Sequence, residues 1–351
     1  MKLRTASVAN AFAAPLVALA ITAAVAALVF ALMGKPAGPA LGLFFVEPLR
    51  TARGLSELAV KATPLLLIAL GLAMAFRANV WNIGAEGQFI AGALVATAIA
   101  LAATEATSRL VVVAIVAGGA LGGMAWASLV AVLRDRFGAN EILVSLMLVY
   151  VAELLLDDLV YGAWKDPRGY NFPQTASFAA TTAIPRLFEG QRAHVGLVVA
   201  VACALVMWLV MARSYAGFQL EVGGVAPRAA RYAGFSARRA LWTALLGSGG
   251  LAGAAGALEV AGPIGQLTPH FPVGYGFAAI VVAFVGRLHP LGIVLASLVM
   301  SMFYIGGELV QSRMGLPRAL TGMFQGVLLV ALLACDAAVQ HRGRRRGQKA
   351  A

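Results

Sequence analysis

The sequence predicts an all-α membrane protein of about ten transmembrane helices, with an internal repeat and helices that break near the centre. Of the 351 residues, 61% are hydrophobic and only 12% are charged, whereas a soluble domain usually has about 25% charged residues. The mean hydropathy is +0.85. Such a chain lacks the polar surface of a soluble enzyme, a secreted module or a disordered protein.

Apolar runs long enough to cross a bilayer recur along the whole chain. They cover residues 12–33, 58–76, 89–103, 110–133, 142–161, 194–212, 241–260, 275–285, 291–309 and 320–337. The first run is longer than the apolar part of a signal peptide, so we expect a retained anchor. We therefore expect an N-terminal anchor helix and external loop at 1–57, a transmembrane core at 58–337 and a basic tail at 338–351.

The net charge of +12 is explained by topology rather than by nucleic acid, because cytoplasmic flanks of membrane helices collect Lys and Arg. Basic residues concentrate in the C-terminal tail and in the 213–240 loop. Both clusters predict cytoplasmic segments, and an even number of passes then places both termini in the cytoplasm. Cys203 and Cys335 lie far apart in apolar runs, which predicts neither a disulfide nor a metal or redox motif.

The most informative stretch is RANVWNIGAEGQF at residues 77–89, which places polar side chains between two apolar runs. Non-helical backbone persists in a membrane only where protein or a water-filled cavity satisfies its polar groups, and transporters use such breaks to present polar groups to a substrate. A carboxylate here is a functional candidate by default. The alternative is an ordinary turn at the membrane surface. The candidate pathway residues are Asn79, Asn82, Glu86 and Gln88.

A second interrupted segment, rich in Gly and Pro, runs from residue 262 to 285. Gln266 and Tyr275 are its candidate pathway residues, and His270 alone would more often be a packing or loop histidine. The two interruptions hold comparable places in the two halves of the chain. This placement predicts an internal repeat with a shared central site.

Two loops are too long to be simple connectors: the external loop 162–193 and the internal loop 213–240. The external loop could lie across the mouth of a pathway. In the internal loop, Pro227 predicts the start of a short helix. Each loop could instead be solvated. No G-x-x-x-x-G-K-[ST] nucleotide loop, metal-ligand spacing or nucleophile elbow occurs, so any ATP must be bound by another chain, for which the 213–240 loop is the expected docking element.

Five motifs in a fixed order carry a family resemblance: NIGAEGQ (82–88), ANEILVSLML (139–148), KDPRGYNFPQT (165–175), APRAARYAGF (226–235) and GYGFAAIVVAFVGRLHPLGI (274–293). Together they resemble the permease subunits of bacterial ABC importers for simple sugars and nucleosides, within the wider group of ribose and branched-chain amino acid permeases. The resemblance extends from about residue 58 to the last span. The loop at 165–175 is most similar to the nucleoside-type members.

The resemblance implies a transporter subunit of the bacterial plasma (inner) membrane without an ATPase site of its own. It implies as partners an ABC ATPase subunit that binds ATP and Mg, a second homologous permease subunit, an extracytoplasmic substrate-binding protein and membrane lipid. The segment 229–234 matches the family helix that contacts the ATPase. The expected coupling residues are Pro227, Arg228, Arg231, Tyr232 and Gly234.

The sequence departs from the family pattern at two positions. Val149 stands where the family usually has Asn, which removes a polar group from the fifth span. Ala226 replaces the Asn that usually precedes Pro227, which removes a possible helix cap. Neither departure removes the expected docking role.

Two other functions remain open at this stage. An ion-coupled secondary transporter for a small polar solute would use Glu86 as its protonatable group. A membrane scaffold without transport is the simplest alternative. Dependence of uptake on a partner ATPase, as opposed to a proton gradient, distinguishes the importer from the secondary transporter.

Overall fold

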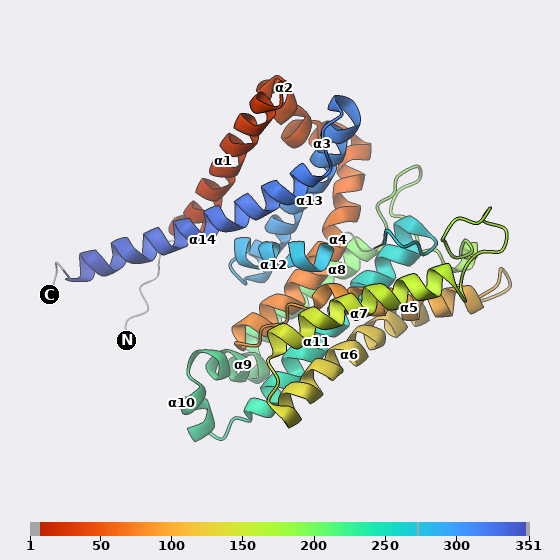
Figure 1. Cartoon of the computed structure of the whole chain (residues 1–351). Coiled ribbons are helices and arrows are strands. Elements are labelled where there is room, and N and C mark those ends of the chain that lie inside the picture. Colours follow the sequence, from red (N-terminus) through yellow and green to blue (C-terminus); the bar gives the residue numbers. More distant parts are fainter. Residues whose placement is uncertain (1–7, 272–273, 349–351) are drawn as a thin grey trace. The chain divides into compact units, whose positions relative to one another are not determined.

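A computed structural model describes residues 8–271 and 274–348. These residues form helices joined by loops, and no β-strand of a sheet occurs among them (Figure 1). The predicted all-α class is confirmed. The chain divides into two compact units, one formed by Met1–Leu58 with Val299–Ala351 and the other by Ala59–Leu298. The division of the chain expected from the sequence, at residues 57 and 337, remains a prediction.

The first unit joins the two ends of the chain around an aromatic core. The Phe44 ring centroid lies 5.4 Å from that of Phe303 and 5.6 Å from that of Phe324, both edge-on, an arrangement that aromatic rings favour. Arg313 and Glu47 form an ion pair of 3.4 Å. The helices of this unit are α1 (Val8–Leu32), α2 (Ala37–Leu41), the π-helix η1 (Gly42–Val46), α3 (Glu47–Arg50) and α14 (Ala319–Gln348).

The second unit holds both predicted interruptions. Two of its helices, α4 and α13, continue into the first unit. Its elements are α4 (Ala52–Arg77), α5 (Ala85–Ala102), α6 (Val111–Phe137), α7 (Glu141–Tyr161), the 3₁₀-helix η2 (Ala180–Thr182), α8 (Gly196–Arg213), α9 (Tyr215–Val225), α10 (Pro227–Tyr232), α11 (Ala237–Glu259), the π-helix η3 (Val260–Ile264), α12 (Tyr275–Val285) and α13 (Pro290–Met314).

The core of the second unit forms where α5, α6 and α11 pack along one another (Figure 1). Glycines let these backbones meet: a Cβ on Gly123 of α6 would lie 2.7 Å from the Cα of Gly253 on α11. Small residues allow this close approach between membrane helices, where dispersion forces and hydrogen bonds drive association. Glycines in these helices therefore allow the close packing of this core.

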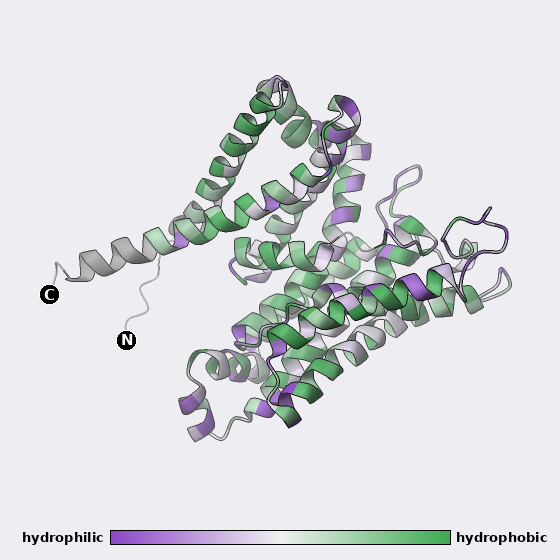
Figure 2. Ribbon diagram, in the orientation of Figure 1, coloured by the Kyte–Doolittle hydropathy of each residue, from purple (hydrophilic) through white to green (hydrophobic). Residues whose placement is uncertain are grey.

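Eight helices of the described residues are long and apolar enough to cross a membrane. Two of the ten predicted passes, α7 and α12, are not among these eight helices. The helix α7 carries Glu153, Asp157 and Asp158 in its second half, and α12 has only 11 residues. The count of ten remains a prediction. Hydrophobic residues predominate along most of the helices (Figure 2). Many large ones are exposed, such as Leu121, which is 63% exposed.

Both interruptions are present as non-α backbone. After α4 ends at Arg77, Asn79 takes a left-handed conformation (φ 55°), which Asn tolerates better than most residues. In the second half, α11 changes into η3, and α12 begins after Gly274 (φ 78°). Each interruption thus precedes a helix whose first residues are buried.

The internal loop differs from its prediction in one respect. The sequence predicts one short helix there, beginning at Pro227, and the structure has that helix as α10 and also α9 before it. Ser214 caps α9, its side chain accepting a 3.0 Å hydrogen bond from the amide of Gly217. The helix α9 has only 11 residues, too few to be predicted as a membrane span from an apolar run.

Candidate functional site

The first interruption contains a closed pair of side-chain amides. Asn82 donates to the Gln88 carbonyl oxygen (2.8 Å), and Gln88 donates back to that of Asn82 (3.0 Å). Asn82 also donates to the hydroxyl of Ser248 on α11 (2.9 Å). All three side chains are buried. Because fully satisfied buried polar networks fix one arrangement of their helices, this network holds the start of α5 against α11.

Glu86 connects the two interruptions. Its carboxylate accepts a 3.0 Å hydrogen bond from the amide of Gly274 and a second from the amide of Gly276. These amides lie at the start of α12, where the first N–H groups of a helix lack partners within the helix and where the helix dipole favours a negative charge. The side chain is 1% exposed. Glu86, at the start of α5, therefore caps the N-terminus of α12.

Tyr275 lies directly beside this cap and is fully buried. Its ring packs edge-on against Phe89 with centroids 5.9 Å apart, and Phe89 stacks on Phe271 at 5.0 Å. The Lys61 ammonium of α4 lies 5.7 Å from the Tyr275 ring centroid, within the range of a cation–π contact. One cation thus lies at the place where α4, α5 and α12 converge.

Gln266 lies apart from this cluster, against the long loop 162–193. It donates to the Gln174 side chain and accepts from the Ser177 hydroxyl, both at 3.4 Å. Main-chain bonds fasten the same segment to the loop: Thr175 N–H to Leu267 O (3.0 Å), Phe178 N–H to Gly265 O (2.9 Å) and Ile184 N–H to Ala261 O (3.1 Å). The loop therefore holds the second interruption in place.

His194 ends this loop and is 2% exposed. Its Nδ1 accepts a 3.1 Å hydrogen bond from the amide of Gly196, and its ring packs against Gly262 of η3. Burial lowers the pKa of His194 from 6.5 to about 4, because removal from water disfavours the charged imidazolium. The folded loop thus requires a neutral histidine.

We expect the protein to lose stability as pH falls from about 6.5 towards 4. In this interval the unfolded chain binds a proton at His194 and the folded chain does not, so the stabilisation is complete above pH 6.5 and declines below it. The check is the thermal unfolding midpoint in detergent across this pH range. His194→Asn should reduce the decrease of the unfolding midpoint with falling pH. The control His270→Asn, at an exposed position, should retain that decrease. The same pH dependence in both variants would contradict the assignment of the decrease to His194.

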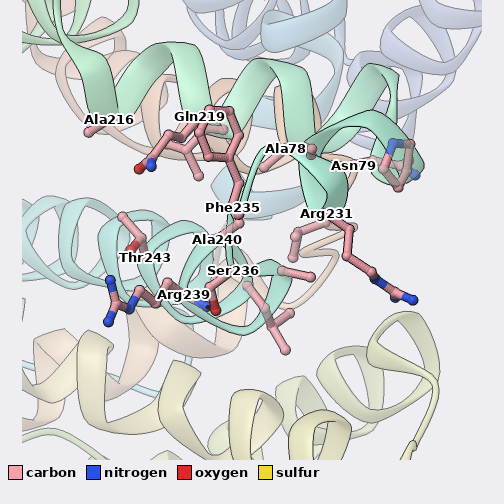
Figure 3. Close-up of a pocket in the computed structure, with 18 of the residues that line it drawn as sticks. Ala78, Asn79, Ala216, Gln219, Arg231, Phe235, Ser236, Arg239, Ala240 and Thr243 are labelled. Atoms are coloured by element: carbon pink, nitrogen blue, oxygen red, sulfur yellow. Dashed lines mark hydrogen bonds between the residues drawn. The ribbon is translucent and has the colours of Figure 1, made fainter.

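Asn79 lies away from the other predicted pathway residues. Its side chain is exposed and accepts from the indole N–H of Trp81 (3.2 Å). It lines a cavity of about 280 Å³ between the end of α4, the helices α9 and α10, and the start of α11 (Figure 3). Arg231 and Arg239 also line it, and their guanidinium groups extend away from each other. Asn79 therefore neighbours the predicted docking segment.

The predicted coupling residues lie together on α10 and the turn after it. Tyr232 is 98% exposed, and Pro227, Arg228, Arg231 and Gly234 are also exposed. Pro227 is the first residue of α10, and no side chain caps that helix, as the Ala226 departure predicts. Ser236 instead caps α11 by accepting from the amide of Arg239 (3.3 Å). These five residues therefore form an exposed surface at α10.

Sequence reasoning missed two polar partners, Ser248 and Lys61. Each leaves a signal, since Ser248 interrupts a run of glycines and Lys61 is a single cation within the apolar run of α4. Across the described residues, no cluster of three or more His, Cys, Asp or Glu side chains could hold a metal ion.

The chain is similar to known transport proteins. Residues 54–333 match the family model described as "Branched-chain amino acid transport system / permease component". The chain is 34% identical to a glucose ABC transporter permease protein of Haloferax volcanii over 85% of this chain and 80% of that protein. It is 29% identical to a guanosine ABC transporter permease protein of Bacillus subtilis, over 76% and 77% of the two chains.

A nucleoside ABC transporter permease protein of Lactococcus lactis is 26% identical over 75% of this chain and 74% of its own length. No solved structure matches the chain significantly. The family predicted from the five motifs is confirmed, and the match covers both interruptions and the predicted docking segment. This multi-pass membrane protein belongs to the family of branched-chain amino acid transport system permease components, as a permease subunit of an ABC importer.

Proposed function

We propose that this chain forms, with a second homologous permease subunit, the translocation pathway of an ATP-driven importer for a nucleoside or simple sugar. The observation that carries the proposal is the family match over residues 54–333, with relatives named for glucose, guanosine and nucleosides. An extracytoplasmic binding protein delivers the solute. The ATP and Mg are bound by the partner ATPase, and this chain binds neither.

The proposed location is the plasma (inner) membrane, with both termini in the cytoplasm. The basic clusters of the 213–240 loop and the C-terminal tail support this orientation. It places α10 on the cytoplasmic side and the loop 162–193 outside. Residues 1–57 then serve as the anchor region, 58–337 as the permease core and 338–351 as a cytoplasmic tail.

Within the pathway, the predicted residues divide into two kinds. Asn82, Glu86 and Gln88 brace it, because the structure pairs their polar groups with protein. Tyr275 and Gln266 shape its wall, Tyr275 from the start of α12 and Gln266 from beneath the outer loop. A permease with few free polar groups suits an importer whose affinity for the solute resides in the binding protein.

Uptake of labelled guanosine and labelled glucose by cells that contain the whole system tests the function. We expect uptake of one of them to require the partner ATPase and to survive collapse of the proton gradient. The opposite dependence would refute the importer and favour the secondary transporter. The structure favours the importer over the secondary transporter, in which Glu86 would carry the coupling proton, because backbone amides already donate hydrogen bonds to both oxygens of its carboxylate.

We expect the double variant Arg231→Ala/Tyr232→Ala to uncouple ATP hydrolysis from uptake. Both side chains are exposed on α10, where a partner ATPase would meet them, and removing such aromatic and arginine anchors costs about 2 kcal/mol or more at an interface. Solute transported per ATP hydrolysed is the measurement in purified complexes. Arg168→Ala, an exposed arginine in the loop 162–193, is the control. Unchanged coupling in the double variant would remove α10 from the docking site.

A further inference from the structure

We propose that Gly224 is a positioning residue, through which movement of α10 reaches the interruption between α4 and α5. The inference rests on the proposed function, because it concerns the route by which an ATPase acts on the pathway. Every residue involved belongs to the second compact unit.

The first step is a direct backbone contact. A Cβ on Gly224 would overlap the carbonyl oxygen of Arg77 and would lie 3.0 Å from the carbonyl carbon of Ala78. The last turn of α9 therefore rests on the last residue of α4 and the first residue of the interruption. With no side chain between these backbones, a displacement on one side must move the other, since close-packed interiors transmit strain.

The second step is the open space beside α10. Only Ala226 separates α9 from α10. The 280 Å³ cavity lies beside them and is lined by Ala78 and Asn79 as well as by Pro227 and Arg231; Ala78, Asn79 and Arg231 are labelled in Figure 3. Leu220, earlier in α9, is 4% exposed within an apolar cluster. The α9 helix is thus anchored at Leu220, α10 borders open space, and Gly224 lies between them.

The third step links the interruption to the core. Asn82 binds Ser248 on α11, and Glu86 binds the amides of Gly274 and Gly276 at the start of α12. A shift at residues 77–78 is therefore passed to the two broken helices through hydrogen bonds and packed backbone, the kind of contiguous contact that carries coupling between distant sites. The irregular backbone at Asn79 (φ 55°) lies on this route, between Ala78 and Asn82.

The adjacent glycine supplies a matched control. A Cβ on Gly223 would meet no atom within 4 Å, so Gly223→Ala changes the same helix by the same methyl group without touching α4. In the purified complex of permeases and ATPase, we expect Gly224→Ala to lower the uptake of labelled solute per ATP hydrolysed about tenfold. Gly223→Ala should change it by less than about twofold.

Equal effects of the two variants, or wild-type coupling in a Gly224→Ala complex, would overturn the inference. If Gly224→Ala does not assemble, a nitroxide at position 79 of the otherwise unchanged chain decides. We expect the mobility of the nitroxide to change on ATP binding, and this change to disappear with Arg231→Ala/Tyr232→Ala. A nitroxide mobility that is the same with and without ATP would overturn the inference. Absence of ATP-driven uptake in the unchanged chain would instead refute the proposed function.

Discussion

Replacing Gly253 by alanine is expected to destabilise the protein and to stop transport. A Cβ at this position of α11 would overlap the carbonyl oxygen of Gly119 and would lie 2.8 Å from the Cα of Gly123, both on α6. Gly92 of α5 meets the same backbone. Helices cannot yield as side chains do, so α6 and α11 must separate, at a cost of about 1–3 kcal/mol or more. The thermal unfolding midpoint of the purified complex should fall by about 1–4 °C.

Gly247→Ala is the control, because it adds the same methyl group to the same helix. Its Cβ would meet only the side chain of Met74, at the terminal methyl group, and methionine adapts readily to such crowding. We expect a much smaller decrease in the unfolding midpoint for this variant. Equal decreases in the two variants would show that the close approach of α6 and α11 does not limit stability.

Local sequence signals predicted much of this fold. The apolar runs predicted where α4, α5 and α6 lie, because the length needed to cross a membrane is set by the helix itself. Pro227 predicted the start of α10, since a proline is favoured in the first turn of a helix and fixes its own φ angle. The polar residues and glycines at 79–88 predicted an interruption that the structure contains.

Contacts between distant segments could not be predicted in this way. Glu86 and Gly274 are separated by 188 positions, and Asn82 and Ser248 by 166. Each pairing depends on how α5, α11 and α12 pack, and no periodic pattern encodes that packing. For the same reason the sequence predicts one site for Asn79 and Asn82, which are three residues apart. In the structure Asn79 faces the cavity beside α10, and Asn82 is buried against α11.

Glu86→Ala is expected to abolish uptake and to lower stability, with Glu86→Gln intermediate. Alanine removes both acceptors and leaves the amides of Gly274 and Gly276 without their partner at the start of α12. A buried group left unpaired costs about 1–3 kcal/mol, so we expect a loss of about 2–6 kcal/mol across the two amides. Glutamine retains one acceptor oxygen. The measurements are the unfolding midpoint and the initial rate of labelled-solute uptake in the assembled complex.

Glu189→Gln is the control, since Glu189 is exposed in the loop 162–193 and should leave uptake and stability unchanged. The two roles considered for Glu86 make different predictions across a pH series. If the carboxylate braces α12, Glu86→Gln lowers uptake by a similar factor at every pH, because a hydrogen bond is lost. If it carries a coupling proton, the substitution removes the pH dependence of uptake itself. We expect the bracing role, because α12 depends on this side chain for its N-terminal cap. Wild-type stability and uptake in Glu86→Ala would contradict both roles.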